Sequence, residues 1–153
     1  MRIPRAALPL LHRLRRAYRR VLKPRTHGVK VLVLHPDHAG GFLLVRHSYG
    51  DRDVWGLPGG GYRPRRESPE HAARRECREE LGIELTSVER VSEHLTGEGG
   101  RGHLTVLSGR AVSADLRPNE EIDATAWVPL DLSGLPAEWR VSARARAAAD
   151  AVR

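Results

Sequence analysis

Three glutamates with helical spacing are the first candidates for chemistry in this sequence. Glu76, Glu79 and Glu80 stand at positions i, i+3 and i+4, so a helix would place their carboxylates on one face. Like charges at this spacing destabilise a helix by about 0.2–0.5 kcal/mol per pair, and clustered carboxylate oxygens suit Mg²⁺ or Mn²⁺. Taken alone, however, such a cluster is more typical of a solvated helix face whose charges are partly neutralised by neighbouring arginines.

Residues 69–81 are expected to form the helix that carries these glutamates. Ser68 is a favourable N-cap, and Pro69 suits the first helical position, where no N–H group is lost. Gly82 supplies the residue that must adopt a positive φ after the last turn. Cys77 falls on the apolar stripe of this helix, so we expect it to be a core residue rather than a catalytic thiol.

The wider pattern around this helix is more specific than the glutamates alone. Gly61 is followed by five residues and Glu67, and seven more residues lead to Arg75-Glu76-Cys77-Arg78-Glu79-Glu80-Leu81-Gly82-Ile83. This segment resembles the Nudix box, with every fixed position at its proper spacing. Only Cys77 departs from the pattern, because a larger aliphatic side chain is usual there. Including the preceding Leu-Pro-Gly-Gly entry and the later strands, the resemblance covers about residues 28–152.

The resemblance implies a Mg²⁺-dependent pyrophosphohydrolase, with Mn²⁺ as an alternative ion. Its substrate would be a nucleoside diphosphate linked to another moiety, cleaved by metal-assisted attack of water on phosphorus. By the same resemblance the metal ligands are the carboxylates of Glu76, Glu79 and Glu80 and the backbone carbonyl of Gly60. Glu67 is implied to be a supporting carboxylate that orients Arg75.

The general base is not fixed by the resemblance, because family members use either a glutamate of the box or one on a later loop. Glu120 is the first distal candidate, ahead of its neighbour Glu121, and both are equally compatible with ordinary loop-surface charges. Glu98, in the glycine-rich loop 97–102, is a third candidate.

Substrate contacts are expected from residues close to the predicted site. Arg46 ends a strand and has a guanidinium that could reach a phosphate, although an ordinary strand-end charge explains it equally well. Gly59 and Gly61 would let the backbone approach metal and phosphate closely. Tyr62 and Trp55 are the aromatic candidates for contact with a nucleotide.

Helices and strands that must position these residues are interspersed along the chain. The expected strands cover residues 29–35, 42–47, 87–95, 103–112 and 124–128, the first two forming a hairpin, and a last helix covers 137–152. This order favours an α/β fold with a mixed sheet. It agrees with the α/β/α sandwich that the Nudix resemblance implies.

The net charge of +7 is unevenly distributed. Residues 1–30 hold ten basic residues and no acidic one, which leaves a net charge of −3 on residues 31–153. We therefore expect residues 1–27 to be a basic amphipathic helical extension and residues 28–153 to be the catalytic domain. Residues 1–24 could pack on the domain or on a second subunit of a homodimer, lie on an anionic membrane surface, or contact RNA.

Several classes of protein are disfavoured by composition. A single cysteine excludes an intrachain disulfide and a cysteine-rich zinc site, and the absence of a long apolar run or signal sequence predicts a cytoplasmic protein. The alternatives to a hydrolase of small nucleotides are a nucleotide-binding module without turnover and an RNA 5′-end pyrophosphohydrolase. The complete set of mutually repelling glutamates favours an enzyme over a binding module.

Overall fold

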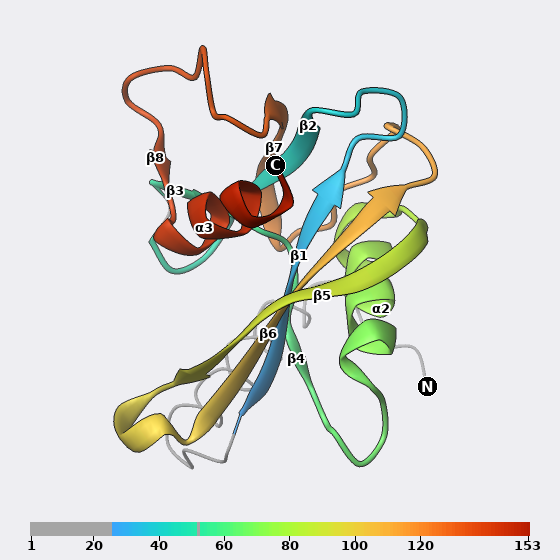
Figure 1. Ribbon diagram of the computed structural model, residues 1–153, viewed down its shortest axis with the longest axis vertical. Helices are drawn as coiled ribbons and strands as arrows, with labels where there is room; N and C mark the ends of the chain where they lie inside the picture. The colour runs from blue at the N-terminus through green and yellow to red at the C-terminus, as the bar shows by residue number, and fades with distance from the viewer. Residues whose placement is uncertain (1–25, 52) are drawn as a thin grey trace.

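A mixed β-sheet forms the centre of the part of the chain that the computed structural model describes, residues 26–51 and 53–153 (Figure 1). Its strands are β1 (His27–Leu34), β2 (Gly41–His47), β3 (Val54–Gly56), β4 (Gly61–Tyr62), β5 (Leu85–Thr96), β6 (Gly102–Ala111), β7 (Ile122–Pro129) and β8 (Arg140–Val141). The helices are α2 (Pro69–Leu81), α3 (Ala143–Val152) and the short 3-10 helix η2 (Glu98–Gly100). The extension expected over residues 1–27 lies almost wholly outside the described residues.

β1 is the central strand of this sheet. The strand order is β5-β6-β1-β2-β3-β8, with β4 also pairing β1 and β7 also pairing β2. β1 runs parallel to β6 over its whole length, and its valine and leucine side chains are buried on both faces. A near-continuous apolar run of this kind is what a strand covered on both sides requires.

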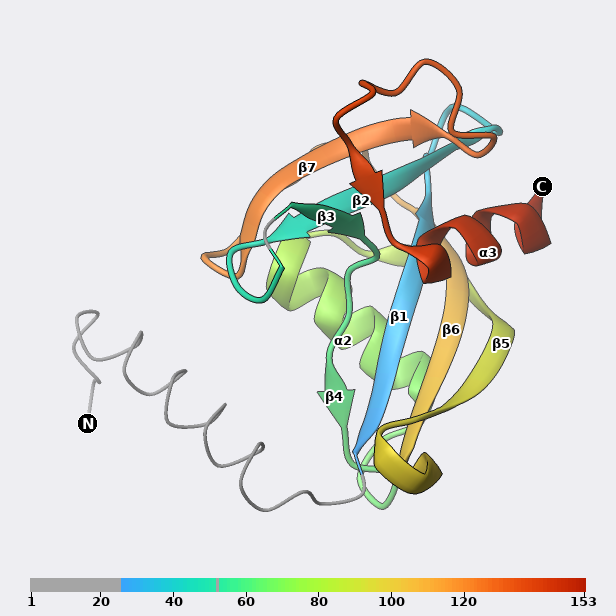
Figure 2. The same ribbon diagram turned by 90° about the vertical axis from the view of Figure 1, so that its left-hand side faces the viewer.

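The antiparallel hairpin expected from β1 and β2 is present but short. The two strands pair at Leu34↔Phe42 next to their turn, and beyond that pair β2 is bonded to β7 and β3. As a result β2, β3 and β7 run steeply away from β1 and β6 (Figure 2). The apolar pattern correctly predicts each strand, but the strands with which β2 pairs depend on contacts that are distant in sequence.

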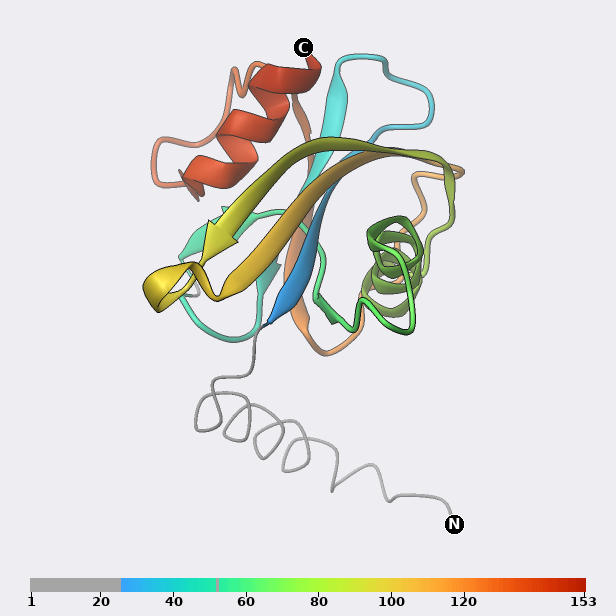
Figure 3. The same cartoon turned by 60° about the horizontal axis from the view of Figure 1, so that its bottom comes forward.

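The two long helices cover opposite faces of the sheet (Figure 3). α2 packs on a core that includes alternate residues of β1, whereas α3 packs on a second core with Phe42 and Trp55. The expected α/β/α sandwich with a mixed sheet is therefore confirmed. Among the described residues, no helix has the length and apolarity needed to cross a bilayer.

The last helix is shorter than expected. Residues 137–152 were predicted to be helical, but α3 starts only after Ser142, whose side chain accepts a hydrogen bond from the N–H of Ala145 as an N-cap. The preceding residues form β8, which pairs in parallel with β3. The ring of Trp139 stacks on Trp55 with centroids 4.0 Å apart. Tertiary contacts with β3 thus override the local helical pattern.

The loop between β3 and β4 lies against β1 and begins the functional end of the sheet. The N–H groups of Val29 and Val31 donate to the carbonyls of Gly60 and Pro58, both at 2.9 Å. Gly59 has φ +139°, and a Cβ there would lie 2.1 Å from the carbonyl oxygen of Val29. This close approach and this φ require glycine at position 59.

Replacing Gly59 with alanine should therefore destabilise the fold by about 3 kcal/mol or more, because β1 and the loop must separate. Gly40→Ala is the matched control, since a Cβ at Gly40 meets no atom within 4 Å; it should change the free energy of unfolding by less than about 0.5 kcal/mol. Urea unfolding of the two variants measures both effects. Equal stability of the two variants would show that the contact between loop and strand is not a constraint.

Candidate active site

The ends of α2 are fixed in the manner that its sequence predicted. The hydroxyl of Ser68 accepts a hydrogen bond from the N–H of His71, and Gly82 adopts φ 67°. Cys77 is fully buried in the core beneath the helix. Burial raises the pKa of its thiol, followed in effect by the nearby carboxylates of Glu80 and Glu76, so the expectation of an inert core cysteine is confirmed.

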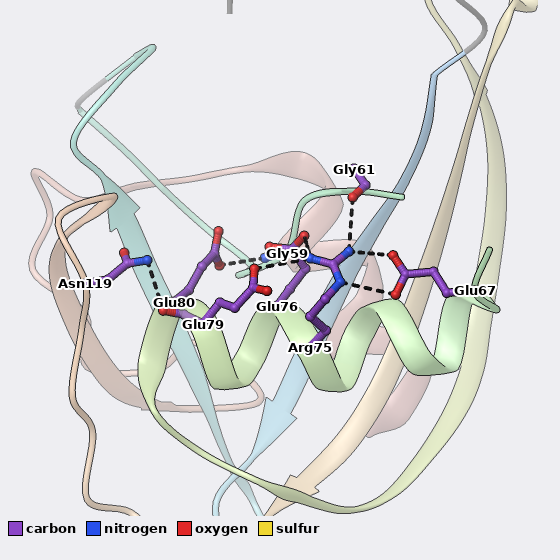
Figure 4. A network of polar contacts seen from close by, with 8 residues as sticks. All are labelled: Gly59, Gly61, Glu67, Arg75, Glu76, Glu79, Glu80 and Asn119. Atoms are coloured by element: carbon purple, nitrogen blue, oxygen red, sulfur yellow. Dashed lines mark hydrogen bonds and ion pairs between the residues drawn. The ribbon is translucent and has the colours of Figure 1, made fainter. Parts of the chain in front are cut away.

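Arg75 links three of the glutamates (Figure 4). Its guanidinium contacts both oxygens of Glu67 (Nε–Oε2 3.1 Å and Nη2–Oε1 2.7 Å). Its Nη1 donates to Glu76 at 2.7 Å and to Glu79 at 3.2 Å. The same side chain donates to the carbonyl oxygen of Gly61 at 3.2 Å. Glu67 thus makes a forked contact that holds the plane of the Arg75 guanidinium.

Glu80 and Glu76 are the two buried carboxylates of the site. Glu80 is 2% exposed and Glu76 is 9% exposed, and Glu80 accepts a hydrogen bond of 2.9 Å from the N–H of Gly59. Burial raises the pKa of Glu80 to about 7, opposed by that hydrogen bond and by the charge of Lys30. Burial likewise raises the pKa of Glu76, with the guanidinium of Arg75 acting in the opposite direction. Two acidic groups are therefore held where their charge is poorly compensated.

These donors fit a hard divalent cation. Buried carboxylates whose charged forms are disfavoured become favourable once a cation neutralises them. A Cβ at Gly60 would lie 2.6 Å from Glu76 Oε1, so only glycine leaves room beside that carboxylate. The carbonyl of Gly60 accepts from Val29 and retains a second lone pair for a metal. In the described part of the chain the carboxylates do not converge to metal-binding spacing, because Arg75 Nη1 occupies the position between Glu76 and Glu79.

Lys30 and His47 were not expected in the site from the sequence. Lys30 donates to the carbonyl of Leu57 at 3.0 Å, and burial lowers the pKa of its ammonium against the opposing charges of Glu80 and Glu76. Both ring nitrogens of His47 are buried without a hydrogen bond to the described residues. Burial, followed by the charge of Lys30, lowers the pKa of His47 to about 4. The only sequence signal was a lysine within an otherwise apolar strand.

The loop after β6 is attached to the C-terminal end of α2. Asn119 lies outside the helix but caps its end. Its backbone N–H donates to the carbonyl of Glu80 and its side-chain amide donates to the carbonyl of Glu79, both at 2.9 Å. Its side-chain oxygen accepts from the N–H of Glu121 at 2.9 Å. The loop therefore satisfies carbonyls that every helix leaves unpaired at its C-terminus, and it brings Glu121 close enough for its charge to raise the pKa of both Glu76 and Glu80.

Two residues that were expected to contact the substrate, Arg46 and Trp55, lie apart from the cluster of glutamates on α2. Arg46 forms an ion pair of 2.7 Å with Asp123 and lies over the ring of Trp55, 5.5 Å from its centroid. Trp55 is only 6% exposed, and its ring is covered by Arg46 and by Trp139. The stacking contact expected of Trp55 would therefore require one of these side chains to be displaced.

The remaining predicted residues are spread over the surface. Tyr62 is half-buried on β4 with its ring against that of His27. Glu120 is exposed, and its backbone carbonyl accepts from the hydroxyl of Ser48. Glu98 lies in η2 at the tip between β5 and β6, at the far end of the sheet from the loop that carries Glu121 (Figure 1).

Comparison with known families gives this geometry a context. The model of the NUDIX domain matches residues 24–149, most of the chain. The chain belongs to the Nudix family. Its glutamates on α2, the glycine loop beside them and the sheet that positions both are therefore those of a Nudix hydrolase.

Individual relatives agree with this assignment. The chain is 37% identical over 105 residues to the nucleoside triphosphatase NudI of Enterobacter sp. (strain 638), covering 58% of this chain and 73% of the relative. It is similar in structure to a MutT Nudix hydrolase from Burkholderia pseudomallei (TM-score 0.63, 25% identity, 84% of this chain and 98% of the other). The MutT protein of Methanosarcina mazei Go1 gives a TM-score of 0.62 at 26% identity, over 84% and 93% of the two chains.

The raised pKa of Glu80 predicts that binding of a divalent cation such as Mg²⁺ by these carboxylates would depend on pH. The folded-state pKa of about 7 lies above the ordinary value of 4.5, so below pH 7 the metal must displace a proton. Affinity for Mg²⁺ should rise by up to about tenfold per pH unit between pH 6 and 7 and level off near pH 8. In the metal-free protein the same shift should lower the free energy of unfolding as pH rises from about 4.5 to 7.

Calorimetric Mg²⁺ titrations at several pH values measure this linkage. Glu80→Gln is the control, because it should bind Mg²⁺ weakly and lose the pH dependence of metal-free stability. A Mg²⁺ affinity that stays constant between pH 6 and 8 in the unsubstituted protein would contradict the prediction.

Proposed function

We propose that this Nudix hydrolase is a Mg²⁺-dependent pyrophosphohydrolase that cleaves a nucleoside diphosphate linked to another moiety, with Mn²⁺ able to replace Mg²⁺. The observation that carries the proposal is the pair of buried carboxylates, Glu76 and Glu80, beside a glycine loop. Holding two such charges out of water is costly unless a cation joins them. The similarity to a nucleoside triphosphatase supports a nucleotide substrate.

Glu76, Glu79, Glu80 and the carbonyl of Gly60 would hold the metal, which supplies Lewis-acid stabilisation of the diphosphate oxygens and lowers the pKa of bound water. Arg75 keeps Glu76 and Glu79 together through Nη1, and Glu67 fixes the orientation of that guanidinium. Because Glu79 is exposed, its side chain can turn from Arg75 toward the metal without disturbing the core.

Lys30 lies buried at the base of the site, where the charges of Glu80 and Glu76 favour its ammonium form against the effect of burial. It is anchored on the carbonyl of Leu57, the first residue of the loop that Glu80 holds through Gly59 two residues later. Together the two contacts fix the loop from both sides. The charge also balances the buried carboxylates and favours the approach of an anionic diphosphate.

Glu121 is the better candidate for the general base, which reverses the order expected from the sequence. Its charge acts on both buried carboxylates, and Asn119 and Ser48 hold its backbone. The exposed Glu120 is placed on the same loop only through its backbone carbonyl. A base must reach the attacking water, so the residue whose charge acts on the metal-binding groups is the stronger choice.

This proposal predicts a large difference between two adjacent substitutions. Glu121→Gln should lower kcat by about 10²–10⁴-fold, the usual contribution of a general base, whereas Glu120→Gln should stay within about twofold. Both variants remove one negative charge from the same loop, so each controls for the other. Steady-state kinetics with Mg²⁺ measures kcat for both variants. A larger loss of kcat in Glu120→Gln than in Glu121→Gln would contradict the proposal and make Glu120 the better candidate for the general base.

The substrate class is tested with a panel of nucleotides in Mg²⁺. Nucleoside triphosphates, 8-oxo-dGTP, ADP-ribose, nucleoside diphosphate sugars, dinucleoside polyphosphates and capped RNA should be compared by separation of their products. We expect turnover of at least one member, and a loss of at least about 10²-fold in Glu79→Gln and Glu80→Gln. No turnover with Mg²⁺ or Mn²⁺ would favour a nucleotide-binding module, and full activity in both variants would show that the metal site is wrongly assigned.

A further inference from the structure

One end of the sheet presents a row of side chains across four strands. Register places Leu95 of β5 opposite His103 of β6, His103 opposite His27 of β1, and His27 opposite Tyr62 of β4. Residues directly opposite one another share a face of the sheet. The His27 and His103 rings are stacked with centroids 5.2 Å apart and an interplanar angle of 5°, and Tyr62 meets His27 edge-on at 5.7 Å. We call these four residues, three with aromatic rings and one leucine, the ring row.

The ring row is open to solvent. His103 and Leu95 are exposed, and Leu95 at 67% is one of only two large apolar side chains exposed in the described residues. Figure 2 shows that β4, the start of β1 and the tip between β5 and β6 meet at the same end of the molecule. Flat rings on adjacent strands at such an edge form a surface on which planar groups can stack.

Arginines border the ring row on its β4 side. A cavity of about 480 Å³ is bounded by His27, Tyr62 and residues 63–66, a segment that contributes Arg63, Arg65 and Arg66. None of these guanidinium groups has an ion pair or side-chain hydrogen bond to the described residues, whereas Arg75 and Arg90 on either side are paired with carboxylates. We call the three the turn arginines.

One more described cation borders this end of the sheet. The carbonyl of Thr26 accepts from the N–H of His103 at 2.8 Å, which holds the start of β1 against β6. Arg101, which lies just before β6, is also exposed. Of the nearby carboxylates, Glu67 and Glu70 are paired with arginines, and Glu98 in η2 adds one negative charge at the same tip, which the turn arginines and Arg101 outnumber.

We propose that the ring row and the turn arginines bind a single-stranded nucleic acid, with bases stacked on the rings and phosphates held by the guanidinium groups. Rings and cations side by side match the alternation of base and phosphate along such a chain. An anionic membrane would need an apolar wedge to insert, and only Leu95 and Pro64 are apolar here. This surface adjoins the catalytic cluster, because the turn arginines lie between Gly61 and Glu67, which both contact Arg75; the proposal does not rest on the proposed hydrolysis.

The test measures binding of a fluorescein-labelled single-stranded RNA of about 12 nucleotides to the full chain by anisotropy, with EDTA present so that no turnover contributes. The variant R63S/R65S/R66S should bind at least about tenfold more weakly at about 0.1 M salt. Its plot of log affinity against log salt should be shallower by about 2, because each phosphate contact on a single strand adds about 0.7 to that slope. The control R117S/R144S/R153S removes the same charge elsewhere and should behave like the unsubstituted protein.

His103→Ala separates stacking from charge. It should weaken binding by about fivefold or more with an unchanged salt slope, because the loss is of ring contact rather than of a phosphate contact. An RNA duplex of the same length should bind more weakly than the single strand, since its bases cannot splay onto the rings. Vesicles containing phosphatidylserine should show no binding that the turn arginines control.

Three results would overturn the proposal. The first is equal RNA affinity for the turn-arginine variant and its charge-matched control. The second is duplex binding as tight as single-strand binding with no effect of His103→Ala. The third is vesicle binding that exceeds RNA binding and is lost in R63S/R65S/R66S, which would identify the surface as a lipid contact.

Discussion

The contact between α2 and the glycine loop on β1 is the interaction on which the site depends. The buried carboxylate of Glu80 accepts a hydrogen bond from the N–H of Gly59, and Gly59 can lie there because its missing Cβ leaves room for the carbonyl of Val29. The helix, the loop and the central strand are thus held in one arrangement. A larger residue at position 59 would separate all three.

The same contact explains the electrostatics of the site. Glu76 and Glu80 lose most of their hydration, and Glu121 adds a third negative charge nearby. Arg75 and Lys30 offset part of this repulsion, each held by a second partner, Glu67 or the carbonyl of Leu57. Incomplete compensation by protein groups leaves the site ready to accept a divalent cation.

Two regions with different chemistry adjoin along β1. One contains the buried carboxylates and the glycine loop, whose Gly60 carbonyl accepts from the N–H of Val29. The other begins at His27, the first residue of β1, where His27, His103 and Tyr62 lie beside the turn arginines. A nucleic acid bound to the rings would therefore lie next to the catalytic groups.

The sequence by itself determined α2, its caps, the spacing of its glutamates and the layered α/β architecture, because these depend on helical periodicity and on residue types close together in the chain. It could not determine the partner of β2, the start of α3 or the presence of Lys30 in the site, since each depends on contacts between segments far apart in sequence. The preference for Glu121 over Glu120 has the same origin. Adjacent glutamates carry the same local signal, and only the tertiary structure, through the bonds of Asn119 to the end of α2, brings the charge of Glu121 to act on the buried carboxylates.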